Sequence, residues 1–305
     1  MRNPIQVARI YQGEWPVLNG LGGQQLPEWV ASSKEDTMAP RISAVINTLN
    51  EEKNLPDALA SAKSWVDEII VVDMYSEDRT REIAESFGAK VYLHERLDFA
   101  DPARAFALSK ATGDWVLILD ADERVLPGLA KALKQFTESD VADVVRIART
   151  NYIFGHRMRA TGWGRHQDLQ LRFFRAGYLE ATATIHDFLH PIPEARVCTA
   201  ALDEDLSIIH LNYTSLAQWF QKMRRYTTIE ADQRYARGEH YRLVWWRFAG
   251  NFVLVFWSRW WGLQGYKDGF YGVLLSLLYA HYDATWRIKL WRKRQAVDVS
   301  SSFPP

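Results

Sequence analysis

A short apolar run, Val116 to Leu119, most constrains the fold of this chain. Four consecutive apolar residues predict a central strand that is buried on both faces. Two carboxylates, Asp120 and Asp122, follow where that strand leaves the sheet. Residues two apart in an extended segment point the same way, so both carboxylates are expected to face one point. Ligands of open α/β sheets bind beyond the carboxyl ends of strands, which makes this edge a candidate ligand site.

Carboxylates that converge on one point repel each other unless a cation lies between them. A hard divalent ion such as Mg²⁺ accepts carboxylate oxygens and completes its shell with water and substrate phosphates. The pattern therefore indicates a divalent-metal site at Asp120 and Asp122. A solvated acidic turn is the alternative.

Strand and helix patterns alternate through the first half of the chain, which predicts a parallel sheet with right-handed crossovers. The expected strands are Ile42–Ile46, Ile69–Val72, Lys90–Leu93, Val116–Leu119, Val141–Ala148 and Leu206–Leu211. The expected helices follow Asn54 and Thr80 and cover Pro102–Thr112 and Leu129–Phe136. Asn54 is a plausible N-cap of the first helix, and Gly88 fits the C-terminal cap of the second.

Three regions are expected from composition. Residues 1–40 form a Gly-, Pro- and Gln-rich extension, residues 41–212 a catalytic α/β domain, and residues 213–305 a helical region. The predicted helices of the last region are Leu216–Gly238, Tyr241–Trp261 and Gly269–Lys293.

Charge and tryptophan are unevenly distributed along the chain. From Tyr213 onward there are 14 Lys and Arg against 6 Asp and Glu, and seven of the 13 Trp lie between Trp245 and Trp291. Aromatic and aliphatic residues mixed with Lys and Arg are typical of helices that lie in a bilayer interface. We therefore expect a cytoplasmic protein bound peripherally to the anionic inner face of the cell membrane. A helical subdomain packed on the catalytic core or on a second subunit is the alternative.

Several classes of protein are disfavoured. No phosphate-binding G-x-x-x-x-G-K-[ST] motif and no G-x-G-x-x-G after the first strand occur. His186 and His190 have zincin-like spacing, but Pro191 follows at once and argues against a helix there. The single cysteine, Cys198, excludes an intramolecular disulfide. No stretch of about 18 uncharged apolar residues predicts a membrane-spanning helix, and no base-reading geometry indicates a nucleic-acid partner.

A set of ordered motifs runs through most of the chain. They are Asn47-Thr48-Leu49-Asn50-Glu51-Glu52, Asp73 with Ser76-Glu77-Asp78-Arg79-Thr80, Arg104 with Ala107-Leu108, Gly113-Asp114-Trp115, Asp120-Ala121-Asp122-Glu123, Gln170-Leu171-Arg172-Phe173-Phe174-Arg175, Ile185-His186-Asp187 and His210. In this order they resemble the GT-A family 2 glycosyltransferases, in particular the bacterial branch that decorates lipopolysaccharide core. The resemblance implies a Rossmann-like α/β fold with a mixed, mostly parallel sheet flanked by helices.

The resemblance also implies roles for individual residues. The implied nucleotide contacts are Thr48, Asn50, Glu51 and Asp73, with Arg104 reaching the base, Asp120 and Asp122 as the ribose and metal–diphosphate pair, and His210 as a further metal or phosphate ligand. Asp187 takes the place of the catalytic base, with Asp168 as its competitor. Two departures, Ala105 and Met74, put details of base recognition in doubt.

The irregular segment between the last strands carries candidate acceptor-side residues, namely Trp163, Arg172 and Arg175. Each role has a structural alternative. Trp163 could only anchor a loop, and the two arginines could pair with sheet carboxylates. Among the other candidates, Asn50 and Glu51 could cap a helix, Asp73 could stabilise a turn, and His210 could be a hydrogen-bonded core histidine.

The expected function is an inverting transfer of a sugar from a nucleotide-sugar, with a UDP-sugar as first candidate, to a hydroxyl of a lipid-linked or cell-envelope glycan. Mg²⁺ or Mn²⁺ would neutralise the diphosphate leaving group, and a carboxylate on the opposite face would take the acceptor proton. A nucleotidyltransferase acting on sugar phosphates is one alternative. A catalytically inactive, membrane-bound scaffold is another.

Overall fold

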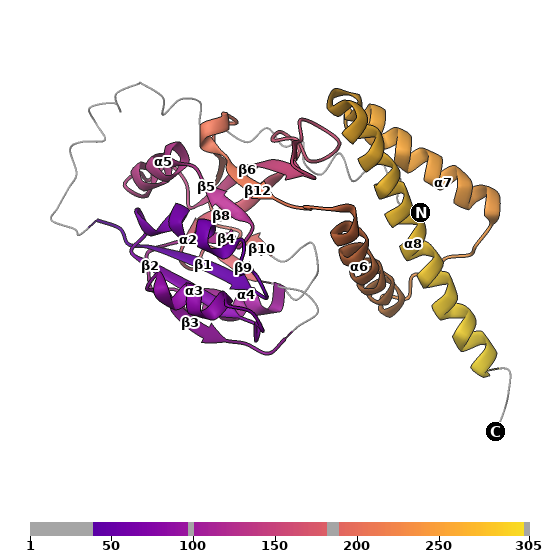
Figure 1. Ribbon diagram of the computed structural model, residues 1–305, viewed down its shortest axis with the longest axis horizontal. Coiled ribbons are helices and arrows are strands. Elements are labelled where there is room, and N and C mark those ends of the chain that lie inside the picture. Colours follow the sequence, from indigo (N-terminus) through magenta and orange to yellow (C-terminus); the bar gives the residue numbers. More distant parts are fainter. Residues whose placement is uncertain (1–38, 97–100, 182–188, 302–305) are drawn as a thin grey trace. The chain divides into compact units, whose positions relative to one another are not determined.

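The computed structural model describes residues 39–96, 101–181 and 189–301, which form two compact units (Figure 1). Unit 1 comprises the described residues up to Arg149 together with those between Leu169 and Ile209. Unit 2 comprises Thr150–Asp168 together with the described residues from His210 onward. Residues 150–168, the segment before β8, therefore group with the C-terminal helices. In the sequence they lie within the catalytic domain expected at residues 41–212.

Unit 1 is organised around a mixed sheet in the order β3-β2-β1-β4-β8-β6-β12-β5, whose strands β6 and β12 continue into unit 2. Its strands are β1 Ile42–Thr48, β2 Glu68–Asp73, β3 Lys90–Leu93, β4 Trp115–Asp120, β5 Glu123–Val125, β6 Val144–Ile153, β8 Leu169–Arg175 and β12 Ile208–Leu211. Strands β1 to β4 run parallel to one another, and β8 runs antiparallel to β4 and β6. The predicted mixed α/β sheet is confirmed in this GT-A-like core, with its parallel strands in the β3-β2-β1-β4 half.

Four shorter strands complete the pairing. They are β7 His156–Arg157, β9 Leu179–Ala181, β10 Leu189–Pro191 and β11 Val197–Thr199. Strands β7 and β11 pair with β6, while β9 and β10 form a separate antiparallel pair. Strands of two or three residues are too short to show an alternating pattern, so the sequence did not predict them.

Helices cover both faces of the unit 1 sheet. They are α2 Leu55–Lys63, α3 Thr80–Ser86, α4 Asp101–Leu108 and α5 Pro127–Thr137. Leu117 and Leu119 join one cluster with α2, α3 and α5, whereas Val116 and Ile118 join the other cluster with α4. Burial on both faces explains why the run is apolar throughout, since each fully buried large apolar side chain contributes about 1.5–3 kcal/mol.

The two predicted helix caps have different outcomes. Gly88 follows α3 with φ +79°, the left-handed conformation that glycine adopts without steric cost, so this prediction is confirmed. Asn54 occupies the N-cap position of α2, as predicted, but it does not cap the helix with its side chain. Its side chain donates a hydrogen bond to Glu51 Oε2 at 2.8 Å and makes no capping bond to α2.

Unit 2 is largely helical, as its composition predicts. Its elements are α6 Leu216–Ala236, α7 Trp245–Trp257, the π-helical turn Ser258–Gly262, the 3₁₀ turn Gly265–Asp268 and α8 Gly269–Ser301. Both α6 and α7 pack against the long helix α8. A cluster that includes Trp219, Met223 and Leu275 joins α6 to α8 and to residues of the segment before Asp168. The 3₁₀ turn is tightly packed, since a side chain at Gly272 would meet the Gly265 carbonyl oxygen at 1.8 Å.

The loop before Asp168 is anchored to the C-terminal helices. The buried carboxylate of Asp268 accepts hydrogen bonds from the backbone N–H groups of Arg159 at 2.7 Å and Ala160 at 3.0 Å, and from the Thr161 hydroxyl at 2.9 Å. Arg259 donates to the Thr161 carbonyl oxygen at 2.6 Å and stacks on the Tyr279 ring. These contacts explain why the irregular segment belongs to unit 2.

Helix α7 has no buried residue, although its sequence is strongly apolar. Trp245 is 74% exposed and Leu254 is 63% exposed, and Trp261 in the following turn is 60% exposed. Among the helices of the described residues, none is both long enough and apolar enough to cross a bilayer. The prediction that no helix spans a membrane agrees with this finding.

Candidate active site

Polar residues gather where the parallel strands β1, β2 and β4 end. Strand pairing sets Thr48 beside Asp73 and Asn47 beside Asp120. The carboxyl ends of parallel strands meet at one edge of a sheet, so these four side chains share one end of unit 1. The register thus brings Thr48, Asp73 and Asp120 to the same edge of the sheet.

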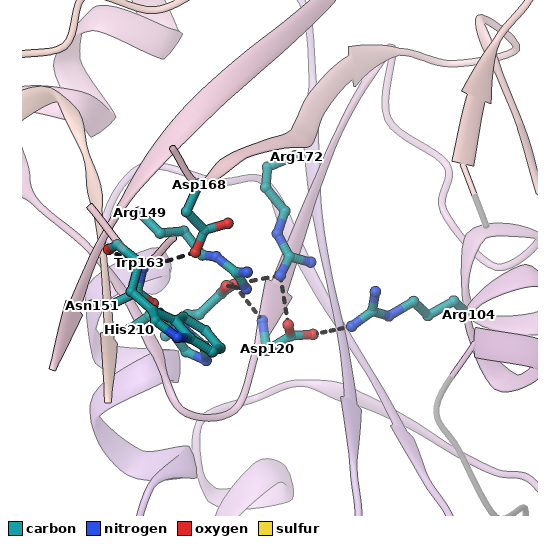
Figure 2. A network of polar contacts seen from close by, with 9 residues as sticks. Arg104, Asp120, Arg149, Asn151, Trp163, Asp168, Arg172 and His210 are labelled. Carbon is teal, nitrogen blue, oxygen red and sulfur yellow. Dashed lines mark hydrogen bonds and ion pairs between the residues drawn. The ribbon is translucent and has the colours of Figure 1, made fainter. Parts of the chain in front are cut away.

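Asp120 is held between two arginines. Its Oδ1 lies 2.5 Å from Arg104 on α4, and its Oδ2 lies 2.5 Å from Arg172 on β8 (Figure 2). Burial opposes the charge of Asp120, but Arg104 and Arg172 outweigh it and hold the pKa of Asp120 far below its usual range. Asp120 is therefore ionised throughout the physiological pH range and is a poor proton acceptor. Arg172 pairs with the carboxylates of Asp120 and Glu123, which was the structural alternative to its acceptor-side role.

Glu123 holds Asp120 and Arg172 in place, a role that was not predicted from the sequence. Its carboxylate is fully buried and accepts hydrogen bonds from Arg172 at 2.8 Å and Arg149 at 3.3 Å. Its second oxygen accepts the backbone N–H of Asp120 at 2.9 Å. Glu123 thus fixes both the position of Asp120 and the orientation of Arg172. Its place in the acidic motif was the only signal in the sequence.

The chain turns directly after Asp120, at Ala121 and Asp122, before β5 begins. The prediction from strand alternation therefore applies only as far as Asp120. Asp122 lies half-buried in this turn. The turn exists because Glu123 reaches back to the Asp120 backbone, which closes the chain over two residues.

The donor atoms of this turn fit a hard divalent cation. Within residues 39–96, 101–181 and 189–301, no three His, Cys, Asp or Glu side chains are grouped to hold a metal ion by themselves. Mg²⁺ in phosphate-transfer sites needs only one or two carboxylates, because substrate phosphates and water supply the remaining ligands. Asp122 and Asp120 offer that number, although both oxygens of Asp120 contact arginines.

The loops after β1 and β2 lock together through side-chain caps. Asn50 Oδ1 accepts the Glu77 N–H at 2.8 Å, and the Asn50 N–H donates to Ser76 Oγ at 2.8 Å. The Glu51 N–H donates to Thr80 Oγ1 at 2.8 Å. Asn50 and Glu51 thus bridge two loops, whereas the alternative had them capping a helix.

Asp73 is fully buried and accepts hydrogen bonds from the backbone and hydroxyl of Ser76. These bonds stabilise the turn, which was the structural alternative to nucleotide binding by Asp73. Arg81 Nε lies 3.8 Å from Asp73 Oδ1. Tyr75, between them, has φ +57° and a side chain that is 55% exposed. A bulky residue in the left-handed region costs about 1–2 kcal/mol, so the surrounding contacts must enforce it.

Two buried polar atoms at the end of β1 lack a hydrogen-bond partner. They are Asn47 Nδ2 and Thr48 Oγ1. A buried donor or acceptor without a partner costs about 1–3 kcal/mol, and native structures usually explain such a group by a ligand, ion or water. Thr48 was predicted as a nucleotide contact, whereas Asn47, although part of the same motif, was given no role.

A second polar cluster lies in unit 2. Asn151 donates to Asp168 Oδ2 at 2.8 Å and to the Trp163 carbonyl oxygen at 2.9 Å, and its Oδ1 lies 2.6 Å from His210 Nδ1 (Figure 2). Because the two donations fix the amide, Asn151 Oδ1 is an acceptor and His210 Nδ1 carries the hydrogen. His210 is thus a buried, hydrogen-bonded histidine, as its structural alternative proposed. Asn151 was not predicted from the sequence.

Trp163 has its ring in the aromatic cluster of unit 2. The ring contacts Tyr213 edge-on at 6.4 Å and Tyr279 at 6.2 Å, while its buried Nε1 has no hydrogen-bond partner. Trp163 therefore anchors its loop and also retains an unused donor. The structure places Trp163, Asp168 and His210 together in unit 2, and Arg104, Asp120 and Arg172 together in unit 1.

Two predicted residues are not brought to these clusters. Arg175 lies beside Trp115, at the opposite end of β4 from Asp120, where it pairs with Asp140 and Asp143. The ion-pair alternative given for Arg175 is therefore present in the structure, because antiparallel pairing turns this end of β8 away from Asp120. Asp187, the predicted base, lies outside the described residues.

The sheet order and its polar edge are those of the GT-A-like class of α/β proteins. Residues 43–191, just under half of the chain, match the family model described as Glycosyl transferase family 2. This part of the chain is therefore a family 2 glycosyltransferase domain. The resemblance seen in the sequence is thereby confirmed.

Curated relatives carry related descriptions. The lipopolysaccharide core biosynthesis glycosyltransferase LpsC of Rhizobium meliloti is 26% identical over 255 residues, which cover 80% of this chain and 92% of LpsC. A TPR repeat-containing protein of Synechococcus elongatus is 44% identical over 86 residues, which cover 28% of this chain and only 21% of that protein. A crystal structure of Staphylococcus aureus TarS residues 1–349 with UDP is 28% identical, covers 36% of each chain and has a TM-score of 0.34.

Proposed function

We propose that this enzyme transfers a sugar, with inversion, from a nucleotide-sugar to a hydroxyl of a lipid-linked or cell-envelope glycan. The main support for this proposal is Asp120, which lies between Arg104 and Arg172 at the carboxyl edge of β1, β2 and β4. Similarity to LpsC supports an acceptor of the lipopolysaccharide-core type. A UDP-sugar is the first donor to test.

Donor binding follows from the charges at this edge. Arg104 and Arg172 present guanidinium groups that form strong, charge-assisted hydrogen bonds to phosphate oxygens. As the bond to the sugar breaks, negative charge grows on the diphosphate, and fixed cations nearby stabilise it. Thr48 and Asn47 offer unused polar atoms to the nucleoside beside them.

Mg²⁺ or Mn²⁺ would be held by Asp122 and Asp120, and would supply further neutralisation of the leaving diphosphate. Ion pairs of Arg104 and Arg172 with Asp120 keep that carboxylate deprotonated. The residues of the chain therefore maintain an ionised ligand whether or not the donor is present.

A single displacement with inversion requires a base that takes the acceptor proton. Asp120 is unsuited because its pKa lies far below its usual range. We assign the role to Asp187, with Asp168 as the alternative, since Asp168 is a carboxylate of the polar cluster in unit 2.

The second part of the proposal concerns location. Exposed Trp245, Trp246 and Trp261, together with the basic end of α8, support peripheral binding to the anionic inner face of the cell membrane. Each basic group near such a surface adds about 1 kcal/mol. The enzyme would then bind its lipid-linked acceptor at the membrane surface.

A donor screen tests the proposed function. The full-length enzyme is incubated with UDP- and GDP-sugars, Mn²⁺ and a rough lipopolysaccharide fraction, and released nucleoside diphosphate is measured. Release of UDP or GDP supports sugar transfer. Release of pyrophosphate from a nucleoside triphosphate and a sugar phosphate would instead identify a nucleotidyltransferase, and failure to bind any nucleotide-sugar would identify an inactive scaffold.

A further inference from the structure

An open groove of about 700 Å³ runs between α6 and α8 in unit 2. It is lined by Ala217, Phe220, Gln221, Arg224, Arg225, Thr228, Thr285 and Lys289. Both helices belong to the same compact unit and pack directly on each other. None of the residues discussed for the donor site contributes to it.

The lining carries three positive charges and no carboxylate. Among the residues that the structure describes, neither Arg224 nor Arg225 makes an ion pair, and both are exposed. Neighbouring cations on the same helices are neutralised, because Lys293 pairs with Asp232 and Arg287 pairs with Asp283. Within the groove, by contrast, Arg224 and Arg225 face no carboxylate among the lining residues.

Lys289 is built into the groove wall. Its ammonium group donates to the Arg224 carbonyl oxygen at 2.8 Å, to Thr227 Oγ1 at 2.8 Å and to Thr228 Oγ1 at 2.7 Å. These bonds hold the charge against α6, close to Arg224. Burial and the nearby Arg224 lower the pKa of Lys289, as expected where positive charges accumulate without a counter-ion.

We propose that the α6–α8 groove binds a phosphate group of the glycan acceptor. A phosphate monoester carries nearly two negative charges at neutral pH and three strong acceptor oxygens. The oxygens suit the two arginines, while Lys289, whose three N–H groups already donate to α6, adds positive charge. The planar arginine fork can form two parallel hydrogen bonds to phosphate oxygens. Phe220, which is 41% exposed, and Ala217 offer apolar surface to whatever bears the phosphate.

That the ligand is the acceptor rests on the proposed function, whereas the phosphate site itself does not. The groove lies in unit 2, outside the family 2 match at residues 43–191. It thus gives the C-terminal helices a role in choosing phosphorylated acceptors over unphosphorylated ones. A surface that is merely basic would not discriminate in this way.

The binding test uses pyrophosphate as the probe and the full-length protein saturated with UDP and Mn²⁺, so that donor-site binding does not contribute. The variant is Arg224→Gln with Arg225→Gln, and the matched control is Arg242→Gln with Lys267→Gln, which removes two exposed charges elsewhere in unit 2. We expect at least tenfold weaker pyrophosphate binding in the groove variant and less than twofold change in the control. Equal weakening in both, or none in either, would overturn the proposal.

A second arm identifies the source of the phosphate. Sugar transfer is compared between phosphorylated and enzymatically dephosphorylated rough lipopolysaccharide. The groove variant should lose the preference for the phosphorylated acceptor while UDP release to water is unchanged. A variant that retains that preference, but loses binding to phosphatidic acid vesicles, would assign the groove to membrane lipid and overturn the acceptor assignment.

The two proposals fail separately. A wild-type protein that binds pyrophosphate in the groove but releases no nucleoside diphosphate with any sugar donor would refute the proposed function and the acceptor role, and leave the phosphate site. Melting temperatures of both double variants establish that each remains folded. Lys289→Gln gives an independent check of binding from the opposite helix.

Discussion

The buried carboxylate of Glu123 accepts the backbone N–H of Asp120 at 2.9 Å. The same side chain receives Arg172, which also pairs with Asp120. The acidic turn is therefore shaped by a residue that need not touch any ligand. Its position, one residue beyond the D-x-D pair, couples the geometry of the site to the stability of the sheet.

Glu123→Gln should destabilise the protein. The substitution removes a negative charge that lies between Arg149 and Arg172 in a buried setting, and loss of one partner from a buried pair costs about 3–5 kcal/mol. Urea denaturation at pH 7 measures the change. Glu77→Gln is the matched control, because Glu77 pairs with Arg96 on the surface and should cost less than about 1 kcal/mol. Equal costs would contradict the supporting role.

Asp122→Asn should weaken nucleotide-sugar binding in the presence of Mn²⁺ by tenfold or more, about 1.4 kcal/mol. The reason is that the amide cannot replace a charged oxygen ligand of a hard cation. Stability without ligand should stay within about 0.5 kcal/mol. Titration calorimetry with and without Mn²⁺ measures the nucleotide-sugar affinity, and scanning calorimetry measures the stability without ligand. Asp57→Asn, on the exposed start of α2, is the control. Unchanged affinity in Asp122→Asn would remove the metal role.

Asp187→Asn should reduce turnover by about two to four orders of magnitude, the usual range for a lost acid–base group, with little change in donor affinity. The base contacts the acceptor hydroxyl and not the diphosphate. Asp168→Asn is the comparison, measured in the same assay with its melting temperature, because Asp168 also accepts a hydrogen bond from Asn151. Full turnover in Asp187→Asn together with loss in a folded Asp168→Asn would transfer the role to Asp168.

Acid should unfold the protein partly through Glu68. Burial opposes the charge of Glu68, but hydrogen bonds from Lys90, Ser43 and Thr112 outweigh it and lower the pKa of Glu68 from 4.5 to about 2. A carboxylate with a lowered folded-state pKa stabilises the fold above pH 4.5, and this contribution is lost as the pH falls toward 2. The urea midpoint should therefore decline over that window, and less steeply in Glu68→Gln. Parallel curves would show that Glu68 is not responsible.

Co-sedimentation with anionic vesicles tests membrane association. Replacing Arg292, Lys293 and Arg294 by Gln should reduce binding, most strongly at low ionic strength, because exposed charges are screened by salt. Replacing Trp245 and Trp246 by Ser should reduce binding at every ionic strength, since burial of apolar area is insensitive to screening. A wild-type protein that remains in the supernatant would exclude the association.

The sequence could predict the central sheet and the family. Four parallel strands followed from apolar runs because a strand buried on both faces must be apolar throughout, as Val116 to Leu119 are. The acidic pair was found because D-x-D follows such a run directly. The helical C-terminal region followed from composition alone. These features are local in the chain, so periodicity reports them.

Only the tertiary structure decided which charges meet. Arg104 and Arg172 reach Asp120 from positions 16 and 52 residues away, and Asn151 contacts both Asp168 and His210, the latter 59 residues after Asn151. Arg172 and Arg175 look equivalent in the sequence, yet the antiparallel register of β8 sends Arg172 to the acidic turn and Arg175 to Asp143. A sequence determines side-chain periodicity within an element, whereas the pairing of distant elements sets which buried charges are neutralised.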